Sequence, residues 1–223
     1  MEMHSLTLCG ATSEKLDAQG SGQYVSESDY HLRDAMTFIS TPPLALQPLG
    51  RTMGEQDIIW LAALGSARKA PTDTDAICRL LDGVSGGAWS PSAQLICDCL
   101  TEMTQSGFLT AKETRSGMEF AAAPRGKKLL LRLMAIPLDH ASHPLGRVGG
   151  SLKLALLDLA DADTRRIVLA DLIRMHRQDA ARVSQLAART PALGPAGQAW
   201  HQRELATAEE KIQWLQSVMD TVR

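Results

Sequence analysis

SPSAQLICDCLTEMTQSGFLTAKETRSGMEFAA, residues 90–122, decides the fold because its apolar spacing changes from a helical period to a strand period. From Leu95 to Met103 the apolar residues fall on one face of a helix. We expect this helix to begin with Ser90 as its N-cap and Pro91 as its first residue, and to end at Gly107. Beyond it, apolar residues alternate in twos about a polar turn at 114–117, which predicts a β-hairpin.

The flanking segments complete a known arrangement. Before residue 90, apolar spacing predicts one helix that ends at Gly65 and a second that is capped at Asp73 and ends at Gly83. After the hairpin, Pro124 opens another helix. Three helices, a hairpin and a helix in this order predict a winged helix-turn-helix over residues 51–136.

The remainder of the chain is predicted to be helical. Residues 137–150 contain Pro, Gly, Ser and two His, and are interpreted as a linker. Residues 151–223 are predicted to form a helical dimerisation domain, with a short helix at 153–159, a long helix capped by Asp161 or Asp163, and a last helix after Gly197. The fold class is thus mainly α with a small β-hairpin wing, followed by long antiparallel helices.

The two long helices carry apolar residues in steps of three and four, which is typical of a coiled-coil seam. Two antiparallel helices cannot also bury Trp200, Trp214 and Val218 by themselves, so we expect a second copy of the chain to cover them in a homodimer. The predicted dimerisation residues are Leu169, Ile173, His176, Val183, Leu205, Ile212, Leu215, Met219 and Val222.

Composition excludes several classes of protein. Aromatic residues make up 4% of the chain and hydrophobic residues 44%, a balance that favours helix packing over a β-sandwich or barrel. The four cysteines have no framework spacing, and the N-terminus lacks a basic region followed by an apolar run, so we expect a protein of the reducing cytoplasm. No stretch approaches the roughly 18 continuous apolar residues that a membrane span requires, so we expect it to be soluble, with no membrane partner. Residues 1–50, with two basic and six acidic residues, are predicted to be a partly irregular extension with one short helix.

Three parts of the sequence resemble PadR-like transcription regulators. Residues 90–109 are similar to the third helix and first wing strand of that family, and residues 120–130, with Gly126, resemble its second wing strand and following helix. Trp214 and Leu215 match the dimerisation helix that ends many members. The resemblance covers about residues 55–222 and implies a dimeric repressor whose recognition helix and wing bind a pseudo-palindromic operator. In some members a small aromatic or other apolar effector releases the DNA.

The candidate DNA-binding residues lie at the start of the third helix, in the wing, in the helix after it and in the first loop between helices. Polar residues at the helix start could contact base edges, and the cations could contact phosphates; a solvated surface is the alternative for both groups. They are Arg68, Lys69, Ser90, Ser92, Gln94, Lys112, Arg115, Arg125, Lys127 and Lys128.

The third helix also motivates a second hypothesis. It exposes Asp98 and Glu102 and carries no Lys or Arg, and Leu95 and Cys97 stand where PadR-like proteins commonly have Thr or Ser and Tyr. The alternative is therefore a winged-helix dimer that does not bind DNA and serves as a protein-interaction or small-molecule-sensing module.

Other chemistry-bearing residues give weaker patterns. Cys97 and Cys99 lie about 200° apart around their helix and cannot share a metal; Cys99 is expected in the core, and Cys97 is a candidate thiol sensor. His176 interrupts the apolar seam, either as an interface residue or as a pH-responsive group. No catalytic motif is present, so we expect neither an enzyme nor a cofactor or metal.

Overall fold

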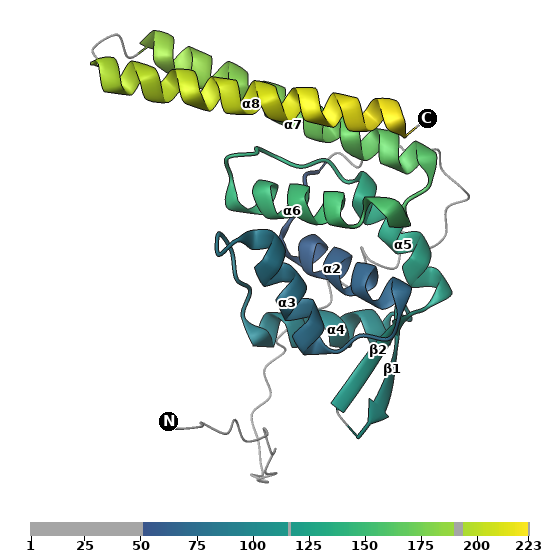
Figure 1. Cartoon of the computed structure of the whole chain (residues 1–223). Helices are drawn as coiled ribbons and strands as arrows, with labels where there is room; N and C mark the ends of the chain where they lie inside the picture. The colour runs from purple at the N-terminus through teal and green to yellow at the C-terminus, as the bar shows by residue number, and fades with distance from the viewer. Residues whose placement is uncertain (1–50, 116, 190–193, 223) are drawn as a thin grey trace, which may run out of the picture. The chain divides into compact units, whose positions relative to one another are not determined.

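The computed structural model describes residues 51–115, 117–189 and 194–222, so the predictions for residues 1–50 fall outside the described part. Three helices are followed by a two-stranded antiparallel hairpin and a fourth helix, which is the predicted winged helix-turn-helix (Figure 1). In the hairpin, Leu109 is paired with Ala122 and Ala111 with Phe120. The elements are α2 (Glu55–Lys69), α3 (Thr74–Ser85), α4 (Ala93–Gln105), β1 (Leu109–Thr114), β2 (Gly117–Ala122) and α5 (Pro124–Ala135).

A second group of helices follows α5. The long helices α7 and α8 lie side by side along their lengths (Figure 1). The bounds are α6 (Pro144–Ala155), the short 3₁₀ helix η1 (Leu157–Leu159), α7 (Ala162–Arg189) and α8 (Pro195–Thr221). The predicted long helices are confirmed, and the Asp161 carboxylate accepts a hydrogen bond from the Thr164 amide at the start of α7. The loop predicted for residues 137–150 is wrong from Pro144 onward, where α6 begins.

The hairpin is attached to the segment between α2 and α3. The Thr72 amide donates to the Phe120 carbonyl at 2.9 Å, and the Phe120 amide donates to the Thr72 carbonyl at 2.7 Å. Thr72 therefore occupies the position of a third strand beside β2, an arrangement that the sequence did not predict. This pairing fixes the base of the wing to the helices.

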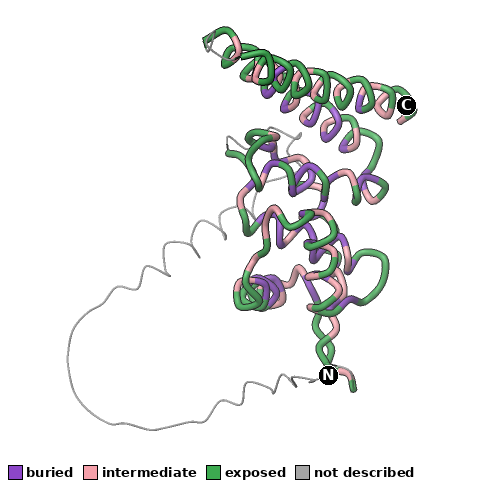
Figure 2. The backbone as a smooth tube through the Cα atoms, turned by 60° about the vertical axis from the view of Figure 1, so that its left-hand side comes forward, coloured by how far each residue is buried: buried purple, intermediate pink, exposed green. Residues whose placement is uncertain are grey.

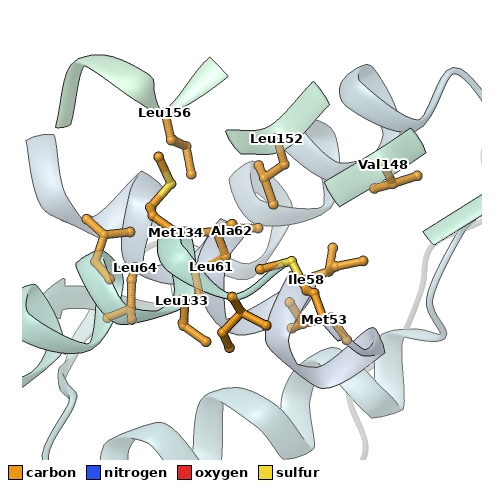
Figure 3. Close-up of a cluster of buried hydrophobic side chains, with 14 of the residues drawn as sticks. Met53, Ile58, Leu61, Ala62, Leu64, Leu133, Met134, Val148, Leu152 and Leu156 are labelled. Carbon is orange, nitrogen blue, oxygen red and sulfur yellow. The ribbon is translucent and has the colours of Figure 1, made fainter. Parts of the chain in front are cut away.

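The core is continuous from α2 to α8. Figure 3 shows side chains of α2, α5 and α6 packed together, among them Leu61, Leu133 and Leu152. The cluster continues through the first half of α7 to Leu215 of α8, and buried positions alternate with exposed ones along these elements (Figure 2). Since a fully buried Leu-type side chain stabilises a fold by about 1.5–3 kcal/mol, this continuity joins the base of α7 firmly to the winged helix.

Two predicted helix ends are wrong for an identifiable reason. Gly65 lies inside α2, where a Cβ atom would stand 2.4 Å from Leu156 Cδ1, so this glycine allows close packing instead of ending the helix. Gly83 lies inside α3, which ends instead at Gly86 with a positive φ of 55°. A positive φ costs glycine little, and it is common just after a helix.

The start of α4 is also shifted from its prediction. Ser90 and Pro91 precede the helix, and the N-cap is Ser92, whose hydroxyl oxygen accepts a hydrogen bond from the Leu95 amide at 3.2 Å. Both serines offer a capping hydroxyl before the same apolar pattern, so the pattern alone could not choose between them.

The seam between α7 and α8 is formed largely within one chain. Leu169, Ile173 and Leu215 are at most 4% exposed, so these three are already covered without a partner. The other predicted seam residues are half-buried, namely His176, Val183, Leu205, Ile212, Met219 and Val222. Trp200 and Trp214 are 58% and 53% exposed.

Among the described helices, none combines the length and the apolar character that a membrane crossing requires.

Candidate nucleic-acid interface

Helix α4 presents a polar but uncharged or acidic surface. Gln94, Asp98 and Glu102 follow one another at intervals of four residues, and all are exposed. The Gln94 amide nitrogen donates to the Asp98 carboxylate at 2.7 Å, and Glu102 accepts a hydrogen bond of 2.7 Å from Gln56 of α2. The acidic side chains of α4 are therefore held by neighbouring amides, and no Lys or Arg lies on this helix.

The beginning of α4 carries three of the predicted contact residues. Ser92 and Gln94 are exposed there, and Ser90 is exposed two residues before the N-cap. Ser90 and Pro91, with Cys78 and Asp82 of α3, line a shallow pocket of about 180 Å³. The free amides at a helix start favour anions such as phosphate.

The wing carries two of the predicted cations. Lys112 lies opposite Glu119 across the hairpin, and Arg115 lies in the turn at its tip; both cations are exposed. A hairpin whose tip carries a cation can reach a phosphate backbone beside the groove that a recognition helix occupies.

Helix α5 adds three exposed cations at its first turn, where it packs against the base of the wing. The Arg125 guanidinium lies over the Phe108 ring, 5.5 Å from its centroid, which fixes the side chain near the end of α4. Lys127 and Lys128 follow. The positive end of the helix dipole repels cations at a helix N-terminus. An anion bound beside these three side chains would offset that repulsion.

Gly126 allows this approach of α5 to the wing. A Cβ atom at this position would stand 2.1 Å from the Phe108 carbonyl oxygen, which also accepts a hydrogen bond from the Ala123 amide. Only glycine lets the helix start lie this close to the first residues of the hairpin.

Arg68 and Lys69 end α2 and come just before Thr72, the residue that pairs with β2. The structure thus brings these two cations to the sheet side, together with the wing and the start of α5. Three polar residues, Ser90, Ser92 and Gln94, lie at the start of α4, which is the opposite end of that helix. A helix of thirteen residues is about 20 Å long, so this length separates them from the end of α4 beside the wing.

A groove of about 370 Å³ separates α4 from the inner face of the wing. Its apolar wall includes Ala111, Met118 and Phe120 of the hairpin, and Cys97 and Thr101 of α4 lie opposite. No ionisable carboxylate or cation lines it. No local sequence pattern predicts this groove, because α4 and the wing form it together. The Gln94–Asp98 pair, by contrast, has a sequence signal, since an interval of four residues places two side chains next to each other on a helix.

The cysteines divide as predicted. Cys99 is 3% exposed, and burial, together with the nearby Glu102, raises the pKa of its thiol to about 11. Cys97 is exposed on α4. Among the described residues no cluster of three potential metal ligands occurs, and His143 caps α6 by accepting a hydrogen bond from the Leu145 amide.

A buried lysine connects the winged helix to α7. Lys153 of α6 is 0% exposed; its ammonium group donates to the Ile136 carbonyl and lies 3.8 Å from the Asp171 carboxylate. Burial lowers the pKa of Lys153 to about 8, against the opposing attraction of Asp171. Asp171 also accepts from the Leu138 amide and from Arg174, so one polar cluster holds the segment after α5 against both α6 and α7.

Comparison with known proteins identifies the class of protein. Residues 50–219 match the family described as "Putative AphA-like transcriptional regulator", and no curated protein matches the chain. Similar solved structures include PadR from Bacillus subtilis in complex with operator DNA, with 17% identity, coverage of 74% of this chain and 99% of that chain, and a TM-score of 0.34. The Vibrio cholerae virulence activator AphA is 20% identical, with coverage of 74% and 97% and a TM-score of 0.30.

The family match leaves out only the first 49 and the last four residues. It confirms the predicted class of winged-helix regulator, and with it the prediction that the protein is not an enzyme. The chain belongs to the AphA-like family of transcriptional regulators.

Proposed function

We propose that this regulator binds a pseudo-palindromic DNA operator as a homodimer, with one winged helix on each half-site, and that it acts as a repressor. The observation that carries the proposal is a group of seven exposed cations around the wing. They are Arg68, Lys69, Lys112, Arg115, Arg125, Lys127 and Lys128.

These seven cations differ from three arginines of the helical arm, the name used here for the paired helices α7 and α8. Within the described part of the chain, none of the seven forms an ion pair. On α7, by contrast, Arg166, Arg174 and Arg182 each pair with an aspartate three residues earlier. Unpaired cations on the wing and beside it are suited to phosphate contacts, which provide most of the affinity in DNA binding.

The dimer is proposed from the exposed aromatic residues of α8. Trp200 and Trp214 leave more than half of their surface in solvent, and Leu186 of α7 is 48% exposed. A second copy of the chain is the occupant we propose for these residues, together with half-buried seam residues such as Ile212 and Met219. A two-fold dimer would place two recognition helices on DNA in inverted orientation.

Repression follows physically from such binding, because a dimer bound to an operator excludes other proteins from the same DNA.

The small apolar effector stays a prediction. The shallow pocket lies between α3 and the start of α4, and the groove lies between α4 and the wing; neither is lined by Trp200 or Trp214.

The test is fluorescence anisotropy of labelled DNA at two salt concentrations. Replacing Arg125, Lys127 and Lys128 with Ala should weaken binding and reduce the salt slope by up to about three, since each phosphate contact contributes about 0.9. The matched control replaces Arg166, Arg177 and Arg203, exposed cations of the arm, and should leave the slope unchanged. An unchanged slope in the wing variant would contradict the assignment of these contacts.

A second function is supported by the surface of α4. Its exposed carboxylates Asp98 and Glu102 would face a polyanion without any compensating cation on the same helix. If the wild-type protein binds no DNA in the anisotropy measurement, the winged-helix dimer is better explained as a protein-interaction or small-molecule-sensing module.

A further inference from the structure

We infer that Gln94 of α4 selects one adenine–thymine base pair by contacting its adenine, and that Asp98 positions the Gln94 amide. This inference rests on the proposed DNA binding and specifies which base pairs it favours. It follows from the hydrogen-bonding groups that remain free on the exposed face of α4 after its internal hydrogen bonds are counted.

The Gln94 side chain is fixed in a definite orientation. A carboxylate only accepts hydrogen bonds, so the 2.7 Å contact with Asp98 requires the Gln94 amide nitrogen to face Asp98. The amide oxygen and the second N–H of Gln94 remain free. Adenine offers an amino group and an acceptor nitrogen in the major groove, which is the complement of one acceptor and one donor on a glutamine.

The two threonines of the second half of α4 offer methyl groups instead of donors. The Thr101 hydroxyl donates to the Cys97 carbonyl at 2.9 Å, and the Thr104 hydroxyl donates to the Leu100 carbonyl at 2.7 Å. With these hydroxyls bonded to the helix backbone, the methyl group of Thr101 remains for contact; Thr101 is exposed and lies two turns after Gln94 on the same face of α4. Methyl and other apolar groups pack against the C5-methyl group of thymine.

Guanine is disfavoured by the same surface. Its edge in the major groove presents two acceptors, which are normally bound by Arg or Lys, and α4 has neither. The carboxylates of Asp98 and Glu102 only accept hydrogen bonds, so they cannot bind the two acceptors of guanine, whereas they could accept from the amino group of a cytosine. The preference for adenine is therefore confined to the position that Gln94 contacts, where its free acceptor and donor match the adenine edge.

The experiment selects bound duplexes from a random-sequence pool, using the purified full chain, and compares it with two variants. The wild type should enrich adenine at one position of each half-site. Gln94→Ala should lose that enrichment, about tenfold in relative affinity, and keep the preferences at other positions. Gln202→Ala changes an exposed glutamine of α8 and should select the same sequences as the wild type.

The role of Asp98 is tested by rescue. Asp98→Ala removes the acceptor that orients Gln94 and should reduce the adenine preference, whereas Asp98→Asn retains an acceptor oxygen and should restore it. The readout is the preference between bases. The total affinity is unsuitable because removing a carboxylate near DNA strengthens binding to any sequence.

Replacing the preferred thymines by deoxyuridine should weaken wild-type binding about fourfold for each methyl group lost from a contact.

The outcomes separate this inference from the proposed function. Failure of the wild type to enrich any sequence would overturn both. Selection of a defined sequence that is unchanged in Gln94→Ala, or that has guanine at the position which Gln94→Ala affects, would overturn the inference alone. An adenine position lost in Gln94→Ala and retained in Asp98→Asn supports it.

Discussion

Lys153 is a charged residue that is fully buried in the described part of the chain. Its ammonium group is removed from solvent between α6, α7 and the segment after α5, with Asp171 as its nearby counter-charge and Arg174 of α7 as a nearby like charge. Asp57 of α2 adds a weaker attraction. Burial of a charge with incomplete compensation favours the neutral form.

The first prediction concerns pH. Because the pKa of Lys153 falls from 10.5 to about 8 on folding, the unfolded chain holds this proton and the folded chain does not between these two values. The free energy of unfolding should therefore rise from about pH 8 to pH 10.5, by up to about 3 kcal/mol from this group. Lys153→Met should remove that rise, measured as urea unfolding across the pH range.

The control for this prediction is Lys128→Met, a change of an exposed lysine, which should keep the rise. The Cys99 thiol, whose pKa is raised by burial, gives an opposite slope at high pH, but it does so in every variant and cancels in the difference. Equal slopes in wild type and Lys153→Met would show that Lys153 is not buried as described.

A second prediction uses two glycines in helices. Gly126→Ala should lower the free energy of unfolding by about 2 kcal/mol, because its Cβ would collide with the Phe108 carbonyl. Gly83→Ala meets no atom within 4 Å and should raise it by about 0.5–1 kcal/mol, since alanine is the better helix former. Urea midpoints of the two variants should move in opposite directions; a shift of both in the same direction would contradict the packing at Gly126.

At the scale of elements, local patterns predicted the helices and strands well. Periodicity and caps located α4, the hairpin, the start of α5 at Pro124 and both long helices. Helix α6 was missed because Gly146, Gly149 and Gly150 give it the composition of a loop. These glycines are explained by tertiary packing, because a larger residue would collide with its neighbours. A Cβ on Gly146 would stand 1.9 Å from the His140 carbonyl oxygen, and one on Gly149 would stand 2.6 Å from Leu138.

The spacing of the apolar residues along α7 and α8 could be predicted from the sequence. Whether a helix of the same chain or of a partner covers them could not. Steps of three and four define an apolar stripe, and the stripe is the same whether a helix of the same chain or of a partner covers it. The structure covers Leu215 within the chain and leaves the adjacent Trp214 in solvent.

These neighbours give a third prediction. Leu215→Ala should lower the free energy of unfolding by about 2–5 kcal/mol, because it leaves a cavity in the core. Trp214→Ala should leave the fold intact and weaken the proposed dimer, as measured by sedimentation over a range of protein concentrations. A Trp214→Ala protein with the wild-type dimer equilibrium would exclude this residue from the interface.

At the scale of the whole molecule, the described part behaves as one packed unit. The core runs without interruption from Met53 to Leu215, and the cluster around Lys153 joins the end of the winged helix to α7. Any movement of the arm on forming the proposed dimer would therefore be transmitted to the winged helix through buried contacts, and not through a free linker at residues 137–150.

The candidate site could be predicted only in part. The cations were visible in the sequence, but their grouping depends on the pairing of Thr72 with β2 and on the close approach at Gly126, which are contacts between distant parts of the chain. Whether the polar residues of α4 are free or already bonded likewise required the structure, as the bond from Gln56 to Glu102 illustrates.

We propose that this AphA-like regulator binds specific DNA as a dimer. The most direct measurement incubates the purified protein with fragmented genomic DNA from the organism that encodes it, then recovers and sequences the bound fragments. We expect a reproducibly enriched motif of two inverted half-sites, with their centres separated by about one helical turn or a multiple of it. Bound fragments that share no sequence beyond the input DNA would contradict it.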